Sequence, residues 1–202
     1  MTARGLFSLA LSGGTSPRPM YGFLDGEDVP WEAGEVFQVD ERIAPEGDGD
    51  RNLTHLRAGL PPAALDRLRP MPVEAAGEGG EVAEEASARY ESALPEALDL
   101  VHLGLGPDGH TASLVPGDAV LDVTDRRVAL TASEYQGHRR MTLTYPALAA
   151  ARQVLWLVTG EEKRDALAGL RAADPSIPGG RVWQEHAVLL CDRAALGPAG
   201  TA

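Results

Sequence analysis

The chain has 202 residues, of which 44% are hydrophobic and 24% are charged, and its formal net charge at pH 7 is −12. This composition is typical of a globular protein and excludes collagen-like, coiled-coil and wholly disordered chains, so we expect residues 1–202 to form a single domain. A surface this acidic repels a phosphate backbone, which argues against nucleic acid as a partner. An anionic small molecule would need a local pocket of positive charge.

Cysteine content and hydropathy narrow the class of protein further. The single cysteine, Cys191, excludes an intrachain disulfide and a cysteine-based zinc site, and it fits a cytoplasmic protein. No segment reaches the roughly 18 apolar residues of a transmembrane helix, so we expect no membrane contact. The apolar run Leu6–Leu11 is also too short for the core of a signal peptide, and we interpret it as a buried strand.

Five short apolar runs have the length and composition of strands that are buried on both faces. In chain order they are Leu6–Leu11, Val36–Val39, Leu98–Leu105, Val154–Val158 and Ala187–Cys191. Segments of helical character lie between them, at Pro17–Leu24, Leu53–Arg57, Glu81–Leu94, Thr144–Arg152 and Glu161–Ala172. This alternation predicts an α/β fold with a mainly parallel central sheet and crossover helices.

Three further segments complete the prediction along the chain. Val128–Ala132 and Met141–Leu143 are strand-like and flank the polar turn Ser133–Arg140. Glu74–Glu85 is rich in Gly, Ala and Glu, and we expect a solvated loop that leads into a helix. Cys191 lies in an apolar run, which predicts a buried thiol.

Polar residues follow four of the five predicted strands directly. Ligands of open parallel sheets bind beyond the carboxyl ends of the strands, so we expect these polar loops to meet in one crevice. In chain order the loops are Ser12–Pro17, Asp40–Arg42, Gly106–Thr111 and Gly160–Lys163.

Two of the loops, together with a pair of arginines, suit a phosphate group. Gly13 and Gly14 let the backbone approach closely, Thr15 and Ser16 add hydroxyl donors, and a helix start follows, although an ordinary strand-to-helix turn has the same sequence. Lys163 is the only lysine among 18 basic residues, and a compact ammonium binds phosphate as a point charge; the alternative is a solvated helix residue. One of Arg139 and Arg140 is a second candidate cation, unless the two form a surface charge pair.

His110 is the best candidate for a general base, because a near-neutral imidazole lies in a glycine-framed turn after a buried strand. Asp108 or Asp40 would orient its ring. The alternatives are an ordinary turn with His110 at a helix start, or a metal ligand, which no cluster of ligand residues supports. We interpret Ser113 as a helix residue rather than a nucleophile, because no G-x-S-x-G elbow surrounds it. The other histidines, His55, His102, His138 and His186, are expected to be structural or exposed.

In this order, these segments resemble the 6-phosphogluconolactonase family over about residues 7–196. The most diagnostic motif is Leu103–Leu114 (LGLGPDGHTASL), and further similarity lies in DER at 40–42 with Asn52 beyond it, RMTLT at 140–144, GEEK at 160–163 and DRAA at 192–195. The related glucosamine-6-phosphate deaminases follow the Asp-Gly-His turn with Phe-Asn-Glu-Pro. This chain has Thr-Ala-Ser-Leu there, which favours the lactonase.

The resemblance implies a three-layer α/β fold and a cytoplasmic hydrolase that acts without metal or cofactor. The implied substrate is 6-phospho-D-glucono-1,5-lactone, of the oxidative pentose phosphate pathway. Carried over by position, the reacting centre comprises Asp40, Arg42, Asp108 and His110. The substrate phosphate is assigned to Gly13, Gly14, Thr15, Ser16, Arg140 and Lys163. We expect Arg42 and the backbone N–H groups of the turn at 106–109 to stabilise the oxyanion.

The chain departs from the family pattern at three points. The family's usual helix before the first strand has no counterpart here. The first loop reads Gly-Gly-Thr-Ser-Pro rather than Gly-Gly-Ser-Thr-Pro, and Arg51 stands where a small serine is usual. Two other functions stay open: an isomerase or deaminase of sugar phosphates on the same scaffold, and a non-catalytic sensor of sugar phosphates.

Overall fold

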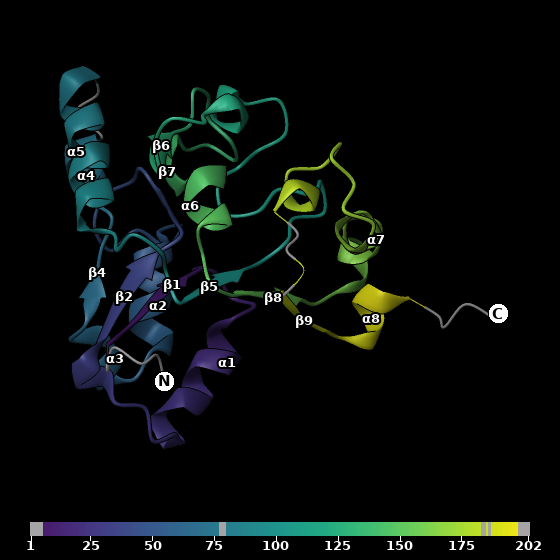
Figure 1. The fold of residues 1–202 in the computed structure, drawn as a ribbon, viewed down its shortest axis with the longest axis horizontal. Helices are drawn as coiled ribbons and strands as arrows, with labels where there is room; N and C mark the ends of the chain where they lie inside the picture. Colours follow the sequence, from purple (N-terminus) through teal and green to yellow (C-terminus); the bar gives the residue numbers. More distant parts are fainter. Residues whose placement is uncertain (1–5, 77–79, 183–184, 186, 198–202) are drawn as a thin grey trace.

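A six-stranded parallel sheet forms the centre of the computed structural model, which describes residues 6–76, 80–182, 185 and 187–197 (Figure 1). Its strands are β1 (Phe7–Leu11), β2 (Gly34–Gln38), β4 (Leu68–Arg69), β5 (Leu100–Leu103), β8 (Val154–Val158) and β9 (Val188–Cys191). They are arranged in the order β4-β2-β1-β5-β8-β9. The chain therefore builds outward from β1 on one side and returns to β5 on the other, which creates a topological switch point between these two strands.

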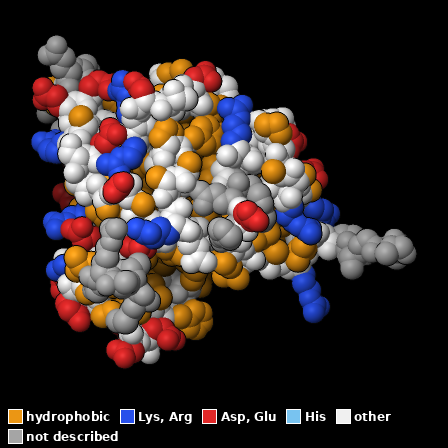
Figure 2. Space-filling view, viewed as in Figure 1, with side chains coloured by type: hydrophobic (Ala, Val, Ile, Leu, Met, Phe, Trp, Pro, Cys, Tyr) orange, Lys and Arg blue, Asp and Glu red, His pale blue; other side chains and the backbone are white. Residues whose placement is uncertain are grey.

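Helices cover both faces of this sheet, because successive strand residues point to opposite sides. On one face, α1 (Arg18–Phe23), α2 (Asn52–Gly59) and α3 (Pro62–Leu65) pack with Leu11 and Val36. On the other, α5 (Gly80–Ala93), α6 (Tyr145–Ala149) and α7 (Arg164–Arg171) pack with Ala10 and Trp156. The predicted three-layer α/β fold is confirmed. Figure 2 shows basic and acidic side chains interspersed over α5 and β4, so this face carries both signs of charge.

A second, antiparallel sheet lies beyond the carboxyl ends of the main strands. It consists of β3 (Asp40–Arg42), β7 (Arg140–Leu143) and β6 (Val128–Leu130), in that order. The two strand-like segments after residue 127 are therefore confirmed as strands. The expected loop at Asp40–Arg42 is instead a strand that pairs with β7, so that Asp40 lies opposite Thr142 and Arg42 opposite Arg140.

Four local expectations were wrong. Ser113 is not helical: Ala112 has φ 48°, and a bridge between Thr111 and Leu114 closes a tight turn instead. Glu74 lies in the short helix α4 (Val73–Ala76) rather than in a loop.

The other two concern β9. It is an edge strand, so Val188 and Leu190 are 40% and 47% exposed and the strand is not buried on both faces. Cys191, expected to be buried, is half-buried there.

Candidate active site

A cleft opens at the switch point, where the loops after β1 and β5 diverge. It encloses about 760 Å³ of empty space, including open solvent at its mouth. The segments that line it include Ser12–Pro17, Asp40 and Arg42 of β3, Asn52, residues 104–106 and 110–112, Arg140 and Lys163. Nine of the ten predicted site residues thus face one cleft, and the tenth, Asp108, lies behind His110.

His110 and Asp108 form a hydrogen-bonded pair. Nδ1 of His110 is 2.5 Å from Oδ1 of Asp108. Nε2 makes no hydrogen bond with any residue that the structure describes, and the ring lines the cleft. Partial burial would raise the pKa of Asp108, but the hydrogen bond and charge of His110, together with the Tyr135 hydroxyl, outweigh it and hold that pKa below its usual value. The carboxylate thus holds the proton on Nδ1 and leaves Nε2 as the base.

The turn that carries this pair is closed by its own backbone. The N–H of Gly106 donates to the carbonyl of His110 at 2.8 Å, and the N–H of Gly109 donates to the carbonyl of Gly106 at 3.0 Å. A side chain at Gly106 would collide with His110 and Asp108, so this position requires glycine. Because the N–H groups of Gly106 and Gly109 are both engaged within the turn, these two groups are not free to donate to an oxyanion.

The strand β3 sorts the side chains of Asp40, Glu41 and Arg42 by period-2 alternation. Asp40 and Arg42 line the cleft, whereas Glu41 points into the protein. There the Glu41 carboxylate accepts the N–H groups of Asn52 and Leu53 at 2.7 and 2.8 Å, which caps the N-terminus of α2. Glu41 therefore anchors α2, and its two neighbours are presented to the ligand.

Asp40 is buried and both of its oxygens are held. Asn52 Nδ2 donates to Oδ1 at 2.9 Å, and Ser113 Oγ donates to Oδ2 at 2.6 Å. Of the two candidate carboxylates, Asp108 rather than Asp40 therefore orients His110. Ser113, although not helical, is fully buried and does not line the cleft, so it is not placed to act as a nucleophile.

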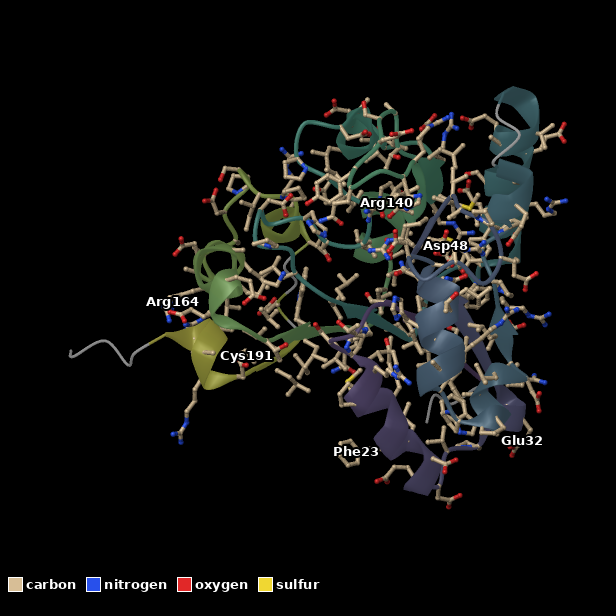
Figure 3. The ribbon with its side chains drawn as sticks, turned by 180° about the vertical axis from the view of Figure 1, so that it is seen from behind. Phe23, Glu32, Asp48, Arg140, Arg164 and Cys191 are labelled. Atoms are coloured by element: carbon tan, nitrogen blue, oxygen red, sulfur yellow. The ribbon has the colours of Figure 1, made fainter. Side chains whose placement is uncertain are left out.

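Two arginines, Arg42 and Arg140, bring positive charge into the cleft. Arg42 and Arg140 are cross-strand neighbours, and each has a buried Nε that no described residue accepts. Burial and the nearby charge of Arg42 lower the pKa of Arg140. Figure 3 shows Arg140 on the second sheet, above the main strands. An anionic ligand would relieve both the repulsion and the missing hydrogen bonds.

The loop after β1 opens its backbone to the cleft. A side chain at Gly13 would collide with Asn52 at the start of α2, and Gly14 has φ 92°, a conformation that glycine adopts readily. Thr15 and Ser16 are exposed at the cleft. The helix α1 begins one residue later than expected, with Pro17 at its N-cap position.

Lys163 reaches the cleft from the turn after β8. The N–H of Gly160 donates to the Asp192 carboxylate at 3.2 Å, and Asp192 also caps α8 (Arg193–Leu196) by accepting the N–H of Ala195 at 2.8 Å. Asp192 therefore connects the turn at residues 160–163 to the N-terminus of α8, the last helix that the structure describes. Lys163 follows at the end of the single 3₁₀ turn Glu161–Lys163, so the only lysine is held at the rim.

A family model for glucosamine-6-phosphate isomerases and 6-phosphogluconolactonase matches residues 1–191. The chain belongs to this family. A 6-phosphogluconolactonase from Synechocystis is 36% identical over 206 residues, which cover 93% of this chain and 81% of that protein. One from Mycobacterium tuberculosis is 34% identical over 213 residues, covering 96% and 86%. The crystal structure of a 6-phosphogluconolactonase from Thermotoga maritima has a TM-score of 0.79 at 27% identity, covering 94% and 86%.

A buried histidine, His102, contacts the start of the loop that follows β1. Nδ1 of His102 accepts the N–H of Ser12 at 3.4 Å and lies 3.0 Å from the hydroxyl of Tyr21. That hydroxyl also lies 2.7 Å from the carbonyl oxygen of Ser12, an acceptor, and Ser12 Oγ donates to the carbonyl of His102 at 2.9 Å. The network fixes Ser12, the residue before Gly13. The expectation that His102 is structural agrees with this position.

Neither His55 nor His138 lines the cleft. His55 is half-buried on α2, His138 contacts Asp50 at 3.1 Å, and His186 lies outside the described residues. The sequence motifs pointed to neither Tyr135, whose hydroxyl contacts Asp108, nor the cap formed by Glu41. If residues 40–42 had been interpreted as a short strand, the alternation of their side chains would have indicated the inward position of Glu41.

Among residues 6–76, 80–182, 185 and 187–197, no helix is both long and apolar enough to cross a membrane. Within the same ranges, no three or more His, Cys, Asp or Glu side chains are grouped so that they could hold a metal ion.

Proposed function

We propose that the protein hydrolyses 6-phospho-D-glucono-1,5-lactone to 6-phospho-D-gluconate. The observation that carries the proposal is the His110–Asp108 pair at 2.5 Å, beside a cleft in which Arg42 and Arg140 each have a buried Nε that no described residue accepts. The relatives named 6-phosphogluconolactonase, at 34–36% identity over nearly the whole chain, support the same reaction.

His110 acts first as a base and then as an acid. Its Nε2 takes a proton from water while the water oxygen attacks the lactone carbonyl carbon, and the carbonyl electron pair moves onto its oxygen. Arg42 faces that oxyanion. When the intermediate collapses, the bond between the carbonyl carbon and the ring oxygen breaks, and the protonated Nε2 returns its proton to the ring oxygen. The carboxylic acid product then loses its proton to solvent.

The other side chains bind and orient the substrate. Gly13, Gly14, Thr15 and Ser16, together with Arg140 and Lys163, hold the phosphate, which lies at the far end of the sugar from the carbonyl. This remote contact positions the ring for attack. Asp40, fixed by Asn52 and Ser113, offsets the arginine charge and accepts a substrate hydroxyl.

The test is acid release from the phosphorylated lactone, measured above the spontaneous rate. His110→Ala should remove nearly all of the catalysed rate, because general-base catalysis is typically worth about 10²–10⁴-fold. His55→Ala is the matched control, since His55 lies on α2 and does not line the cleft. Equal, small effects of both substitutions would contradict the assignment. Formation of a keto sugar in place of acid would indicate an isomerase or deaminase instead.

A further inference from the structure

Tyr135 lies in a loop that the rest of the fold holds in place. The loop connects β6 to β7, and the N–H of Tyr135 donates to the carbonyl of His138 at 2.9 Å. At the start of the loop, the carboxylate of Asp118 accepts the N–H groups of Ala132 and Ser133 at 3.0 and 2.9 Å. Tyr135 therefore extends toward the cleft from an anchored backbone.

The side chain of Tyr135 contacts both members of the catalytic pair. Its hydroxyl donates to Oδ2 of Asp108 at 2.9 Å, and His110 bonds to the other oxygen of that carboxylate, Oδ1. The same hydroxyl lies 3.4 Å from Nδ1 of His110. The tyrosine and imidazole rings meet edge to face, with centroids 5.2 Å apart and an interplanar angle of 65°.

A cation holds the tyrosine from its other side. The guanidinium carbon of Arg140 lies 5.1 Å from the centroid of the Tyr135 ring, and Nη2 of Arg140 donates to the carbonyl of Tyr135 at 2.9 Å. The ring thus packs between a phosphate-site cation and the general base, and both neighbours restrict its rotation.

We propose that Tyr135 is a positioning residue for His110: its hydroxyl fixes the second oxygen of Asp108, and its ring limits rotation of the imidazole. A carboxylate bound at one oxygen only can pivot, and the His110 ring would pivot with it. With both oxygens bound, the Asp108 carboxylate keeps Nε2 of His110 aimed at the place where water attacks.

The hydroxyl also changes the charge that His110 experiences. By donating to Asp108 it draws off part of the carboxylate's negative charge, and it helps to lower the pKa of Asp108. Without that bond, the Asp108 carboxylate would keep more of its negative charge beside the imidazole and would stabilise the protonated ring more strongly. The other charged groups that line the cleft, Asp40, Arg42, Arg140 and Lys163, are the same with and without the hydroxyl.

The inference rests on the proposed function, and Tyr135→Phe tests it because that change removes only the hydroxyl. We expect kcat for the phosphorylated lactone to fall roughly tenfold with KM nearly unchanged, the scale of one lost hydrogen bond to a charged group. The acid limb of the kcat profile should move to higher pH. Tyr135→Ala, which also removes the ring, should lower kcat further.

Tyr145→Phe is the matched control. Its hydroxyl donates to the carbonyl of Pro178 at 3.2 Å and Arg181 lies 6.0 Å from its ring centroid, but Tyr145 does not line the cleft. This variant should keep the kcat and the pH profile of the unmodified protein. An unchanged kcat and acid limb in Tyr135→Phe would overturn the proposal. A rise in KM alone would also overturn it, because that result indicates a contact with substrate.

An NMR titration of the ¹⁵N-labelled free protein separates this inference from the proposed function. The His110 signal is identified by its loss in His110→Ala, and its nitrogen shifts report which ring nitrogen carries the proton. We expect Nδ1–H in the unmodified protein and a titration midpoint at higher pH in Tyr135→Phe. If that shift occurs but no lactone is hydrolysed, the positioning contact stands and the proposed function fails. If lactone is hydrolysed and Tyr135→Phe changes neither titration nor kcat, only this inference fails.

Discussion

Replacing the buried His102 with asparagine should make the protein less sensitive to acid between about pH 6.5 and pH 4. His102 is 1% exposed, and burial lowers its pKa from 6.5 to about 4. The folded protein therefore keeps this imidazole neutral at pH values where the unfolded chain protonates it. Because the unfolded chain binds the additional proton, the free energy of unfolding decreases as the pH falls through this window.

The size of the effect follows from the pKa difference. One pKa unit corresponds to about 1.4 kcal/mol, so His102 costs about 3 kcal/mol of stability by pH 4. This is a large share of the roughly 5–15 kcal/mol that stabilises a typical domain. An asparagine side chain is also polar, but it gains no proton in acid.

The assay is urea unfolding at pH 7 and pH 4.5, and the quantity compared is the stability lost between the two. This difference cancels any loss of packing that a variant suffers at both pH values. His102→Asn should lose about 2–3 kcal/mol less than the unmodified protein. His55→Asn, at a half-buried position on α2, should lose as much as the unmodified protein does. Parallel losses in all three proteins would refute the reasoning that His102 is kept neutral by burial.

Three further outcomes are expected. Ser113→Ala leaves the buried Asp40 carboxylate without one donor, so it should lower the free energy of unfolding by about 1.5–3 kcal/mol and also lower kcat. Ser87→Ala, which loses a bond to the neutral carbonyl of Val128, should cost about 0.5–1.5 kcal/mol and leave kcat unchanged, and equal effects would contradict the charged bond. Lys163→Ala should raise KM for the phosphorylated lactone by roughly 10–100-fold but leave the slow turnover of unphosphorylated gluconolactone unchanged; equal damage to both would place the phosphate elsewhere. Activity should survive EDTA, and a loss that one divalent ion restores would make Asp108 and His110 candidate ligands.

Local patterns carried the prediction of the main sheet and of its polar loops. Runs such as Val36–Val39 are apolar and short, and burial between helix layers is the arrangement that removes them from water on both faces. The contact between Asp108 and His110 was also within reach, since the two residues are separated by one glycine in a tight turn. Three short-range features, a buried strand, a glycine turn and an acid–histidine pair, were thus sufficient to indicate a general base.

One strand of the second sheet, β3, was beyond such patterns. Asp40–Arg42 has no apolar alternation, because two of its three side chains serve the cleft and the third caps α2. Its strand character comes entirely from pairing with β7, a partner remote in the chain. The same holds for β9, where the apolar sequence predicted burial on both faces, and its position at the sheet edge leaves Val188 and Leu190 exposed.

The sequence by itself determined the α/β class, the strand ends at which ligands bind, and the residue types that suit a phosphate and a general base. The tertiary structure decided which of those residues are neighbours. Ser113 bonds to Asp40 across 73 positions, and Tyr135 bonds to Asp108 across 27. Hydrophobic periodicity reports only which side of an element is buried, whereas a hydrogen bond depends on atoms within about 3 Å of each other. Such distances are fixed only when the two sheets pack together, and they make Asp108 the carboxylate that orients His110 and Asp40 the one that does not.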